Sequence, residues 1–133
     1  MHTILTENAP APGGHYSQAV VHAGLVYVSG MLPLNPGSMP LDPISGQPVT
    51  GEIEAQAERA LENLKAVLEA AGSGLDCVLK VTVYVSDMAL WGRVNAVYAR
   101  YFGEHKPART VAPVNALHYG CLVEMDAIAY LRR

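Results

Sequence analysis

Residues 78–85 read Val-Leu-Lys-Val-Thr-Val-Tyr-Val, and this alternation of apolar and polar side chains is typical of a β-strand that buries one face. The side that faces the core is predicted to hold Leu79, Val81, Val83 and Val85. The other side is predicted to hold Lys80, Thr82 and Tyr84. Because a strand of this kind needs another layer against its apolar side, the flanking segments decide the fold class.

The segment before this strand has the period of an amphipathic helix. From Glu52 to about Ala71, apolar residues recur at steps of three and four, which places them on one helical face. These residues are Ile53, Ala57, Ala60, Leu61, Leu64, Val67, Leu68 and Ala71. Thr50 or Gly51 is expected to cap the start of the helix, and Gly72 is expected to end it.

A second helix is predicted directly after the strand. Ser86 or Asp87 can cap its start, its body runs to about Phe102, and Gly103 follows as its end. Its inward side is predicted to hold Leu90, Val94, Val97, Tyr98 and Tyr101.

Further strands are expected on either side of the helices. Residues 18–30 contain two β-branched runs around Ala23-Gly24, which favours a hairpin. Two more strands are predicted at Arg109–Ala116 and Gly120–Leu131. The order of strands, helix, strand, helix and strands predicts an α+β fold, with two helices on one face of a mixed sheet.

Length and composition limit the class of protein. A chain of 133 residues is predicted to form one domain, residues 1–133. Hydrophobic residues make up 50% and charged residues 16%, which excludes a disordered protein and favours an oligomer that hides apolar surface. The net charge of −3 offers no basic face, so no nucleic-acid partner is expected.

The N-terminal third gives no sign of a targeting or membrane-spanning segment. Its first residues contain neither a basic cluster nor an apolar core of signal-peptide length. Prolines interrupt the uncharged stretch from Asn8 to Leu41, which therefore cannot form a spanning helix. Residues 31–51 are rich in proline and glycine and are predicted to form an irregular loop. We therefore expect a cytoplasmic protein with no membrane partner.

Several common catalytic and cofactor-binding motifs are absent from the sequence. It contains no Gly-x-Gly-x-x-Gly, no Gly-x-x-x-x-Gly-Lys and no Gly-x-Ser-x-Gly. The five histidines are not spaced as paired metal ligands, and Cys77 and Cys121 lie in apolar contexts typical of buried, inert thiols. We therefore expect no metal, no cofactor and no disulfide.

Arg109 is the first candidate for a functional residue. It begins a predicted strand that is otherwise free of charge, so its guanidinium needs a carboxylate partner. That partner is either Glu124 or Asp126 of the same chain, or a small substrate bound by the planar guanidinium. If the last two strands pair directly, Glu124 lies nearer Pro113 than Arg109. The two side chains then meet only through another strand order or across a subunit boundary.

Seven groups of residues, in order along the chain, resemble the YjgF/RidA family. They are residues 6–10 with 16–19 and 28–30, Gln56 with 60–64, residues 69–72, residues 81–85, Val94-Asn95 with Tyr98 and Phe102, residues 107–110, and residues 123–129. The resemblance covers essentially the whole chain. It implies a chorismate-mutase-like subunit in a homotrimer, with a central barrel of strands and a cleft between each pair of subunits.

The same resemblance implies an activity and a set of site residues. The activity is the hydrolysis of 2-aminoacrylate-type enamines and their 2-imino acid tautomers to 2-keto acids and ammonia, without cofactor or metal. Arg109 matches the residue that binds the substrate carboxylate, and Glu124 matches the acid that positions or activates water. The positions that match the lining of the cleft are Tyr16, Ser29, Gly30 and Asn95.

Structural roles for these lining residues stay open from the sequence. Ser29 can simply end a strand before Gly30, Asn95 can brace a helix, and Tyr16 can pack at an interface.

The sequence departs from the family pattern around the expected cleft. Val111 stands where the family commonly has cysteine, and Pro113 replaces a commonly acidic or polar residue. His15 and His118 stand where the family usually has proline. Residues 36–51 also form a longer loop than is usual. These changes are expected to reshape the rim of the cleft.

Two further function classes stay open from the sequence. One is a non-catalytic trimer that binds small carboxylates as a sensor or chaperone-like module. The other is a pathway-specific deaminase acting on an aminomuconate-like or aminoacrylate-like catabolite. An endoribonuclease label is also used for the family, but the acidic charge balance argues against a general nucleic-acid cleft.

Overall fold

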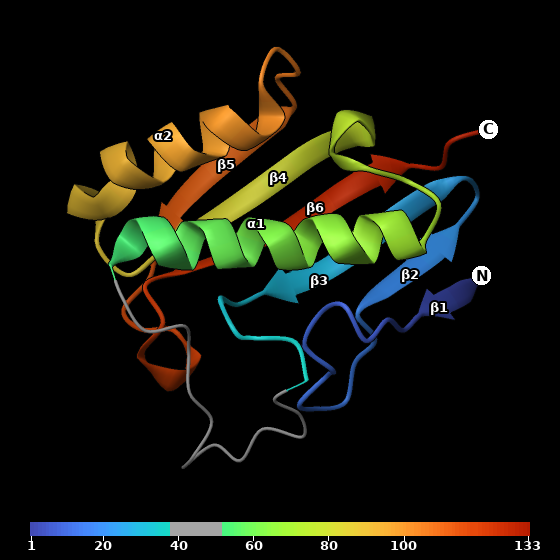
Figure 1. Ribbon diagram of the computed structural model, residues 1–133, viewed down its shortest axis with the longest axis horizontal. Coiled ribbons are helices and arrows are strands. Elements are labelled where there is room, and N and C mark those ends of the chain that lie inside the picture. The colour runs from blue at the N-terminus through green and yellow to red at the C-terminus, as the bar shows by residue number, and fades with distance from the viewer. Residues whose placement is uncertain (38–51) are drawn as a thin grey trace.

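The computed structural model describes residues 1–37 and 52–133, which form a sheet with two α-helices on one face (Figure 1). The strands are β1 (His2–Ile4), β2 (Ala19–His22), β3 (Leu25–Met31), β4 (Val78–Val85), β5 (Ala108–Pro113) and β6 (Val123–Tyr130). The helices are α1 (Ile53–Ala70) and α2 (Trp91–Phe102), and short 3-10 turns span Leu75–Cys77, Met88–Leu90 and His118–Gly120. Residues 38–51 of the predicted loop lie outside the described residues.

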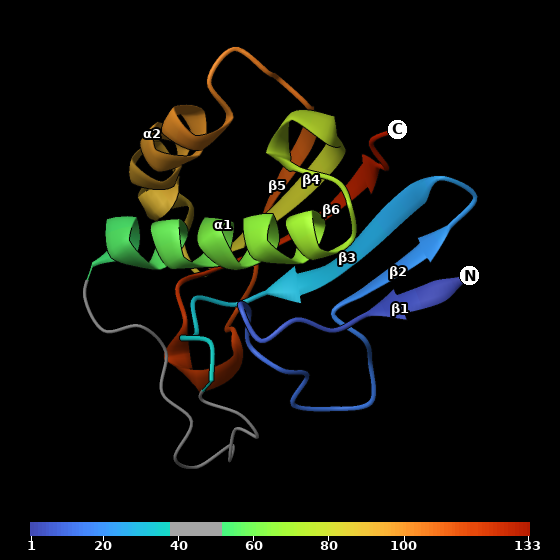
Figure 2. The same ribbon diagram turned by 45° about the vertical axis from the view of Figure 1, so that its right-hand side comes forward.

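The strand order across the sheet is β1-β2-β3-β6-β4-β5. Neighbouring strands are antiparallel, except that β4 and β5 run parallel. Both helices lie on the same side of the sheet in two views of the molecule (Figures 1 and 2). The predicted α+β class, with a mixed sheet and two helices on one face, is therefore confirmed.

The last two strands of the chain do not pair with each other. Between them lies β4, in which Tyr84 is opposite Glu124 of β6 and beside Ala112 of β5. The direct pairing considered for Arg109–Ala116 and Gly120–Leu131 is therefore wrong. The strands are arranged differently because α2 forms the crossover from β4 to β5. This crossover allows β5 to run parallel to β4, at the edge of the sheet.

The hydrophobic core lies between the helices and the sheet. The three valines of β4 that follow Lys80 are fully buried there, as the alternation predicted. Leu79 was expected to join them, but its side chain is 45% exposed. A register irregularity between Val78 and Lys80 shifts the alternation of β4, so that Val78 takes the buried position instead.

The ends of the helices follow the local sequence signals. Helix α1 begins after Glu52, whose side chain makes no capping hydrogen bond, while the expected caps Thr50 and Gly51 lie outside the described residues. Gly72 has a φ of 85°, which confirms the predicted left-handed stop. The side chain of Asp87 accepts a hydrogen bond from the Ala89 N–H at 2.9 Å, and the turn Met88–Leu90 leads into α2.

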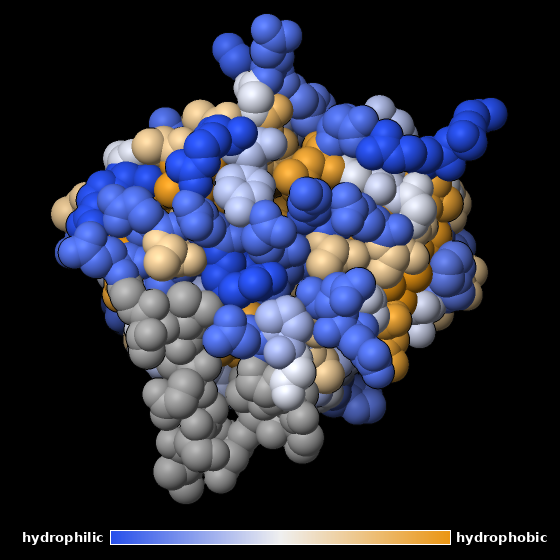
Figure 3. Space-filling model, viewed as in Figure 1, coloured by the Kyte–Doolittle hydropathy of each residue, from blue (hydrophilic) through white to orange (hydrophobic). Residues whose placement is uncertain are grey.

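The outer surface of the two helices is largely hydrophilic (Figure 3). Arg93 of α2 forms ion pairs with Glu52 and with Glu54 of α1. Arg100 of α2 forms an ion pair with Glu58 of α1. These pairs are exposed, so each contributes little to stability.

The face of the sheet without helices has a different character. It carries the partly buried side chains predicted for it: Lys80, Thr82, Tyr84, Glu124 and Asp126. Tyr27 and Tyr130 add aromatic side chains that are 44% and 43% exposed. This face therefore combines two carboxylates with exposed aromatic surface, and one of those carboxylates lies in a cavity.

Candidate functional site

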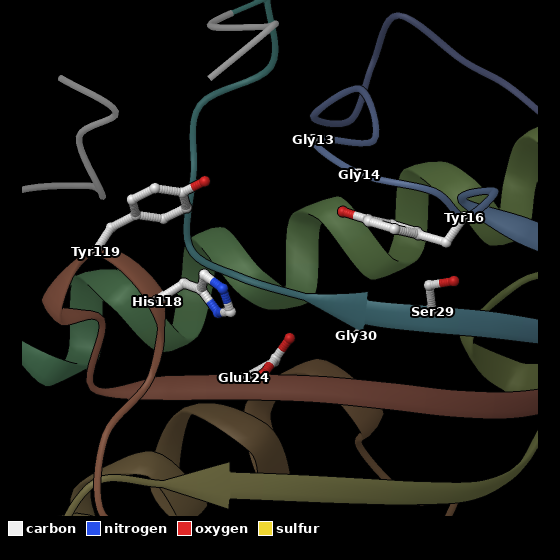
Figure 4. Close-up of a pocket in the computed structure, with 8 residues that line it drawn as sticks. All are labelled: Gly13, Gly14, Tyr16, Ser29, Gly30, His118, Tyr119 and Glu124. Atoms are coloured by element: carbon white, nitrogen blue, oxygen red, sulfur yellow. The ribbon is translucent and has the colours of Figure 1, made fainter. Parts of the chain in front are cut away.

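A cavity of about 400 Å³ opens where β3 ends and β6 begins. Its walls come from the N-terminal loop, from β3, from the turn His118–Gly120 and from β6 (Figure 4). The lining residues are Gly13, Gly14, Tyr16, Ser29, Gly30, His118, Tyr119 and Glu124. The structure therefore brings together four of the six residues expected from the sequence: Tyr16, Ser29, Gly30 and Glu124.

Glu124 projects into this cavity because of its place in β6. It alternates with Val123 and Met125, which are buried under the helices, so its side chain points to the opposite face of the sheet. Gly30 lies beside it, and a Cβ atom on Gly30 would be 3.0 Å from Cδ of Glu124 and closer still to Oε2. A glycine at position 30 therefore leaves the space that the carboxylate occupies.

The backbone of β3 is irregular at the same place. Between Val28 and Met31, two residues of β3 face one residue of β6, which is the arrangement of a β-bulge. The two residues of β3 in this bulge are Ser29 and Gly30. Bulges re-aim side chains near functional sites, and this one places the backbone of Gly30 against the Glu124 carboxylate.

The electrostatics of Glu124 follow from its surroundings. Partial burial raises the pKa of the Glu124 carboxyl, the positive charge of His118 opposes this rise, and the nearby Asp126 adds to it. Asp126 itself accepts a hydrogen bond from the Tyr84 hydroxyl at 3.3 Å. Within the described residues, no hydrogen bond occupies the Glu124 carboxylate, so its oxygens remain available for water or a ligand.

Gln18 holds the N-terminal loop, which forms the wall of the cavity opposite Glu124, in place. Its amide, which is 1% exposed, accepts from the Thr6 N–H at 2.7 Å and donates to the Pro10 carbonyl at 2.9 Å. Ser29 donates from its hydroxyl to the Ser17 carbonyl at 2.6 Å. These bonds fix the segment that carries Tyr16, so the Ser29 hydroxyl serves as a brace for this wall.

Arg109 lies in a second cavity, of about 340 Å³, between α2 and the edge strand β5. Its Nη1 donates to Oδ1 of Asn95 at 3.0 Å. The guanidinium also lies over the rings of Trp91 and Tyr98, at 4.6 Å and 4.9 Å from their centroids. Because β5 is an edge strand and the Arg109 side chain is exposed, burial within the chain does not force a carboxylate partner on its guanidinium.

Arg109 and Glu124 lie on opposite faces of the sheet. Arg109 is beside Val81, whose side chain points to the helices, whereas Glu124 is opposite Tyr84 on the other face. Among the described residues no ion pair joins Arg109 to Glu124 or to Asp126. The alternative of a register-fixing pair within one chain is therefore wrong, and the cation and the acid belong to separate cavities.

The sequence placed His118 only at the rim of the cleft and indicated no site role for Tyr119, Trp91 or Tyr98. His118 and Tyr119 form one wall of the first cavity, and Trp91 and Tyr98 stack on Arg109 in the second. The sequence signal for His118 was that it stands where the family usually has proline. No signal in the sequence placed the aromatic rings beside Arg109.

The described part of the chain contains neither a cluster of metal ligands nor a membrane-spanning helix. No three His, Cys, Asp or Glu side chains in residues 1–37 and 52–133 lie close enough to hold a metal ion. No helix in those ranges is long and apolar enough to cross a membrane. Cys77 and Cys121 are buried free thiols, and burial raises the pKa of the Cys121 thiol to about 11.

Known proteins resemble this chain over almost its whole length. A RutC family protein of Pyrococcus horikoshii is 47% identical over 127 residues, which cover 96% of this chain and 95% of that protein. The crystal structure of the E. coli YjgF gene product superimposes with a TM-score of 0.87 at 38% identity, covering 99% of this chain and all of that one. E. coli TdcF with bound serine gives a TM-score of 0.87 at 31% identity, with the same coverage.

A family model agrees with these similarities. The model described as Endoribonuclease L-PSP matches residues 6–131. This range contains both cavities and every residue expected to line them. The chain therefore belongs to the Endoribonuclease L-PSP family, which is the YjgF/RidA family that the sequence resembles.

Proposed function

We propose that this protein hydrolyses 2-imino acids and their enamine tautomers to 2-keto acids and ammonia, at sites shared between copies of the chain in a homotrimer. The observation that carries the proposal is the separation of Arg109 and Glu124 onto opposite faces of one sheet. A substrate that needs both groups is bound only where Arg109 of one copy meets the Glu124 cavity of another. The exposed aromatic surface on the face without helices supports such an assembly.

Arg109 is suited to hold the substrate carboxylate. Its guanidinium is fixed by the Asn95 side chain and by two aromatic rings, so little side-chain freedom is lost when an anion binds. The remaining N–H groups can donate two parallel hydrogen bonds to a carboxylate. Asn95 thus acts by positioning Arg109. Bound serine in TdcF gives related support, because an amino acid carries the same carboxylate next to a nitrogen-bearing carbon.

Glu124 is suited to activate water. In the iminium form of the substrate C2 is electrophilic, so a positioned base and a water molecule are enough for attack. The carboxylate takes a proton as the water oxygen bonds to C2. It then returns the proton to nitrogen. The C–N bond breaks to release ammonia as the hydroxyl oxygen forms the C=O bond and loses its proton to the carboxylate or to solvent. Gly30 shapes the floor of the cavity, while Tyr16 and Ser29 form its wall.

The activity is tested with an imine generated in the assay. An L-amino-acid oxidase acting on alanine releases 2-iminopropanoate, and semicarbazide traps whatever imine remains. The expected result is that the wild-type chain lowers semicarbazone formation in proportion to its concentration and releases pyruvate and ammonia faster. Unchanged semicarbazone formation at every concentration would overturn the deaminase proposal and leave a protein that only binds small carboxylates.

Sharing of the site between copies predicts complementation between two inactive variants. Arg109→Ala and Glu124→Gln are each expected to be inactive alone. When the two are unfolded and refolded together, about a quarter of the interfaces join an intact arginine to an intact glutamate, so about a quarter of wild-type activity returns. The measurement is the imine assay on the refolded mixture, with native mass spectrometry expected to give three times the 14.2 kDa of one chain.

A matched mixture controls this experiment. Arg109→Ala refolded with the double variant Arg109→Ala/Glu124→Gln contains no intact arginine and is expected to stay inactive. Activity that does not return in the first mixture, although mixed oligomers are present by mass, would contradict a shared site.

Gly30→Ala tests the space around the acid. The added Cβ would meet Glu124 at its Cγ, Cδ and Oε2 atoms, so the carboxylate must move while the rest of the fold stays in place. A displacement of this size is expected to lower kcat about 100-fold. The control is Gly92→Ala on α2, where an added Cβ meets nothing within 4 Å. This control is expected to keep full activity and to gain about 0.5–1 kcal/mol of stability.

A further inference from the structure

His118 faces Glu124 across the first cavity, although the two residues come from different segments. His118 belongs to the turn before β6, and Glu124 belongs to β6 itself. Figure 4 shows the imidazole ring and the carboxylate pointing toward the same space. Within the described residues no hydrogen bond joins them, so that space can hold a small molecule between an imidazole and a carboxylate.

The backbone of the turn holds His118 in this direction. Tyr119 has a φ of 61° and Gly120 a φ of 71°, so two successive residues adopt the left-handed conformation. That conformation is unfavourable for a bulky side chain such as tyrosine, and strained positions of this kind gather at functional sites. The rings of His118 and Tyr119 are in contact, with centroids 5.7 Å apart, which further fixes the imidazole.

The proposed reaction includes a proton transfer that comes before hydrolysis. An enamine must gain a proton at C3 before C2 becomes electrophilic enough for water to attack. A second group that gives this proton leaves Glu124 in the carboxylate form that activates water in the next step. Of the described residues that line the cavity, only His118 carries an imidazole, the side chain that most often serves as a general acid in enzymes.

The charges around His118 suit a proton donor. Glu124 of β6 supplies negative charge, and the uncharged rings of Tyr119 and Tyr16 complete the neighbouring walls. No lysine or arginine is among the described residues that line this cavity. The charge of the imidazolium therefore meets the Glu124 carboxylate and no cation from the described residues of its own chain.

We propose that His118 is a catalytic residue that protonates C3 of an enamine substrate, so that this protein accelerates enamine-to-iminium conversion as well as iminium hydrolysis. The imidazolium gives its proton to C3, the C2–C3 double bond supplies the electron pair, and C2 becomes the carbon of an iminium ion. Water then adds to C2 with the help of Glu124. The imidazole is reprotonated from solvent, and the net reaction remains enamine plus water to 2-keto acid plus ammonia. This inference rests on the proposed deaminase function.

The test compares two sources of one product in His118→Gln. A serine dehydratase supplies the enamine 2-aminoacrylate, and an amino-acid oxidase acting on alanine supplies 2-iminopropanoate directly. The variant is expected to lose about 10- to 100-fold of the acceleration with the enamine source and to keep the wild-type acceleration with the imine source. The matched control is His22→Gln, at an exposed histidine that ends β2 and lines neither cavity, which is expected to match the wild type with both sources.

A second measurement uses the wild-type chain alone. A threonine dehydratase working in D₂O supplies 2-aminobut-2-enoate, and the 2-keto acid is reduced at once by lactate dehydrogenase so that its C3 hydrogens no longer exchange. Protonation by a fixed acid is expected to give an excess of one C3-deuterated stereoisomer over a reaction without the chain. His118→Gln is expected to lose that excess.

The outcomes separate the two proposals. No acceleration by the wild type with the imine source would overturn the deaminase function itself. Acceleration with the imine source, together with equal behaviour of wild type and His118→Gln on the enamine source, would overturn only the role of His118. An equal loss with both sources would also overturn that role, because it would show that His118 acts on a step common to both.

Discussion

Replacing Arg109 with alanine is expected to lower kcat/KM for 2-iminopropanoate by about 100- to 1000-fold. The substrate carboxylate then loses a charged, bidentate partner that the Asn95 side chain and two aromatic rings hold in place. Arg109→Lys is expected to recover only a small part of this loss, because an ammonium group cannot form the paired hydrogen bonds. The measurement is the initial rate in the oxidase-coupled assay over a range of imine supply.

Arg100→Ala is the matched control for this variant. Arg100 also lies at the surface beside α2, but it pairs with Glu58 on the outer side of the helices, away from both cavities. It is expected to change kcat/KM less than twofold and stability by about 1 kcal/mol or less. Thermal unfolding of both variants checks that neither has lost its fold. Arg109→Ala with the activity of Arg100→Ala would contradict the proposed carboxylate site.

The local structure of this protein could be predicted from the sequence because it follows short-range rules. The alternation in β4, the periodic apolar face of α1 and the glycine at position 72 each depend on neighbouring residues only. Leu79 shows the limit of that reasoning. Its exposure comes from a register irregularity against β6, and a strand that is distant in sequence decides where such an irregularity falls.

The order of the strands could not be predicted in the same way. The parallel pairing of β4 and β5 depends on how α2 packs over the sheet, and it moves β6 into the centre between β3 and β4. A three-residue strand such as β1 carries too little pattern to be recognised, although it pairs with β2 at the sheet edge.

The candidate site was only partly accessible from the sequence for the same reason. Resemblance to a family identified Arg109 and Glu124 as a pair, but only the sheet shows that β4 separates them and that they use opposite faces. The placement of Gly30 against Glu124 depends on the bulge in β3. The position of His118 beside Glu124 depends on a left-handed turn that follows from no local signal.

Replacing Glu124 with glutamine is expected to lower kcat by about 100- to 10,000-fold, which is the usual contribution of a general base. Glutamine keeps the shape of the side chain next to Gly30 but cannot accept a proton from water. Glu58→Gln is the matched control, because Glu58 lies on the outer side of α1 and contacts Arg100 instead of a cavity residue. The control is expected to retain wild-type kcat. An active Glu124→Gln variant would exclude this residue as the base.

The raised pKa of the Glu124 carboxyl leads to two further expected results, one for the wild type and one for Glu124→Gln. The proposed reaction needs the carboxylate, so kcat/KM of the wild type is expected to fall with decreasing pH already above the ordinary glutamate pKa of about 4.3.

The second result concerns stability. A carboxyl whose pKa is higher in the folded chain than in the unfolded chain contributes its full stabilisation below the unfolded pKa. This contribution is lost as pH rises through the folded pKa. At neutral pH the charged form therefore costs stability, and Glu124→Gln is expected to have a higher Tm than the wild type, with the difference disappearing in acid. Thermal unfolding of both proteins from pH 4 to pH 8 measures this, and a lower Tm of the variant at neutral pH would show that the Glu124 carboxylate is stabilised in the folded chain.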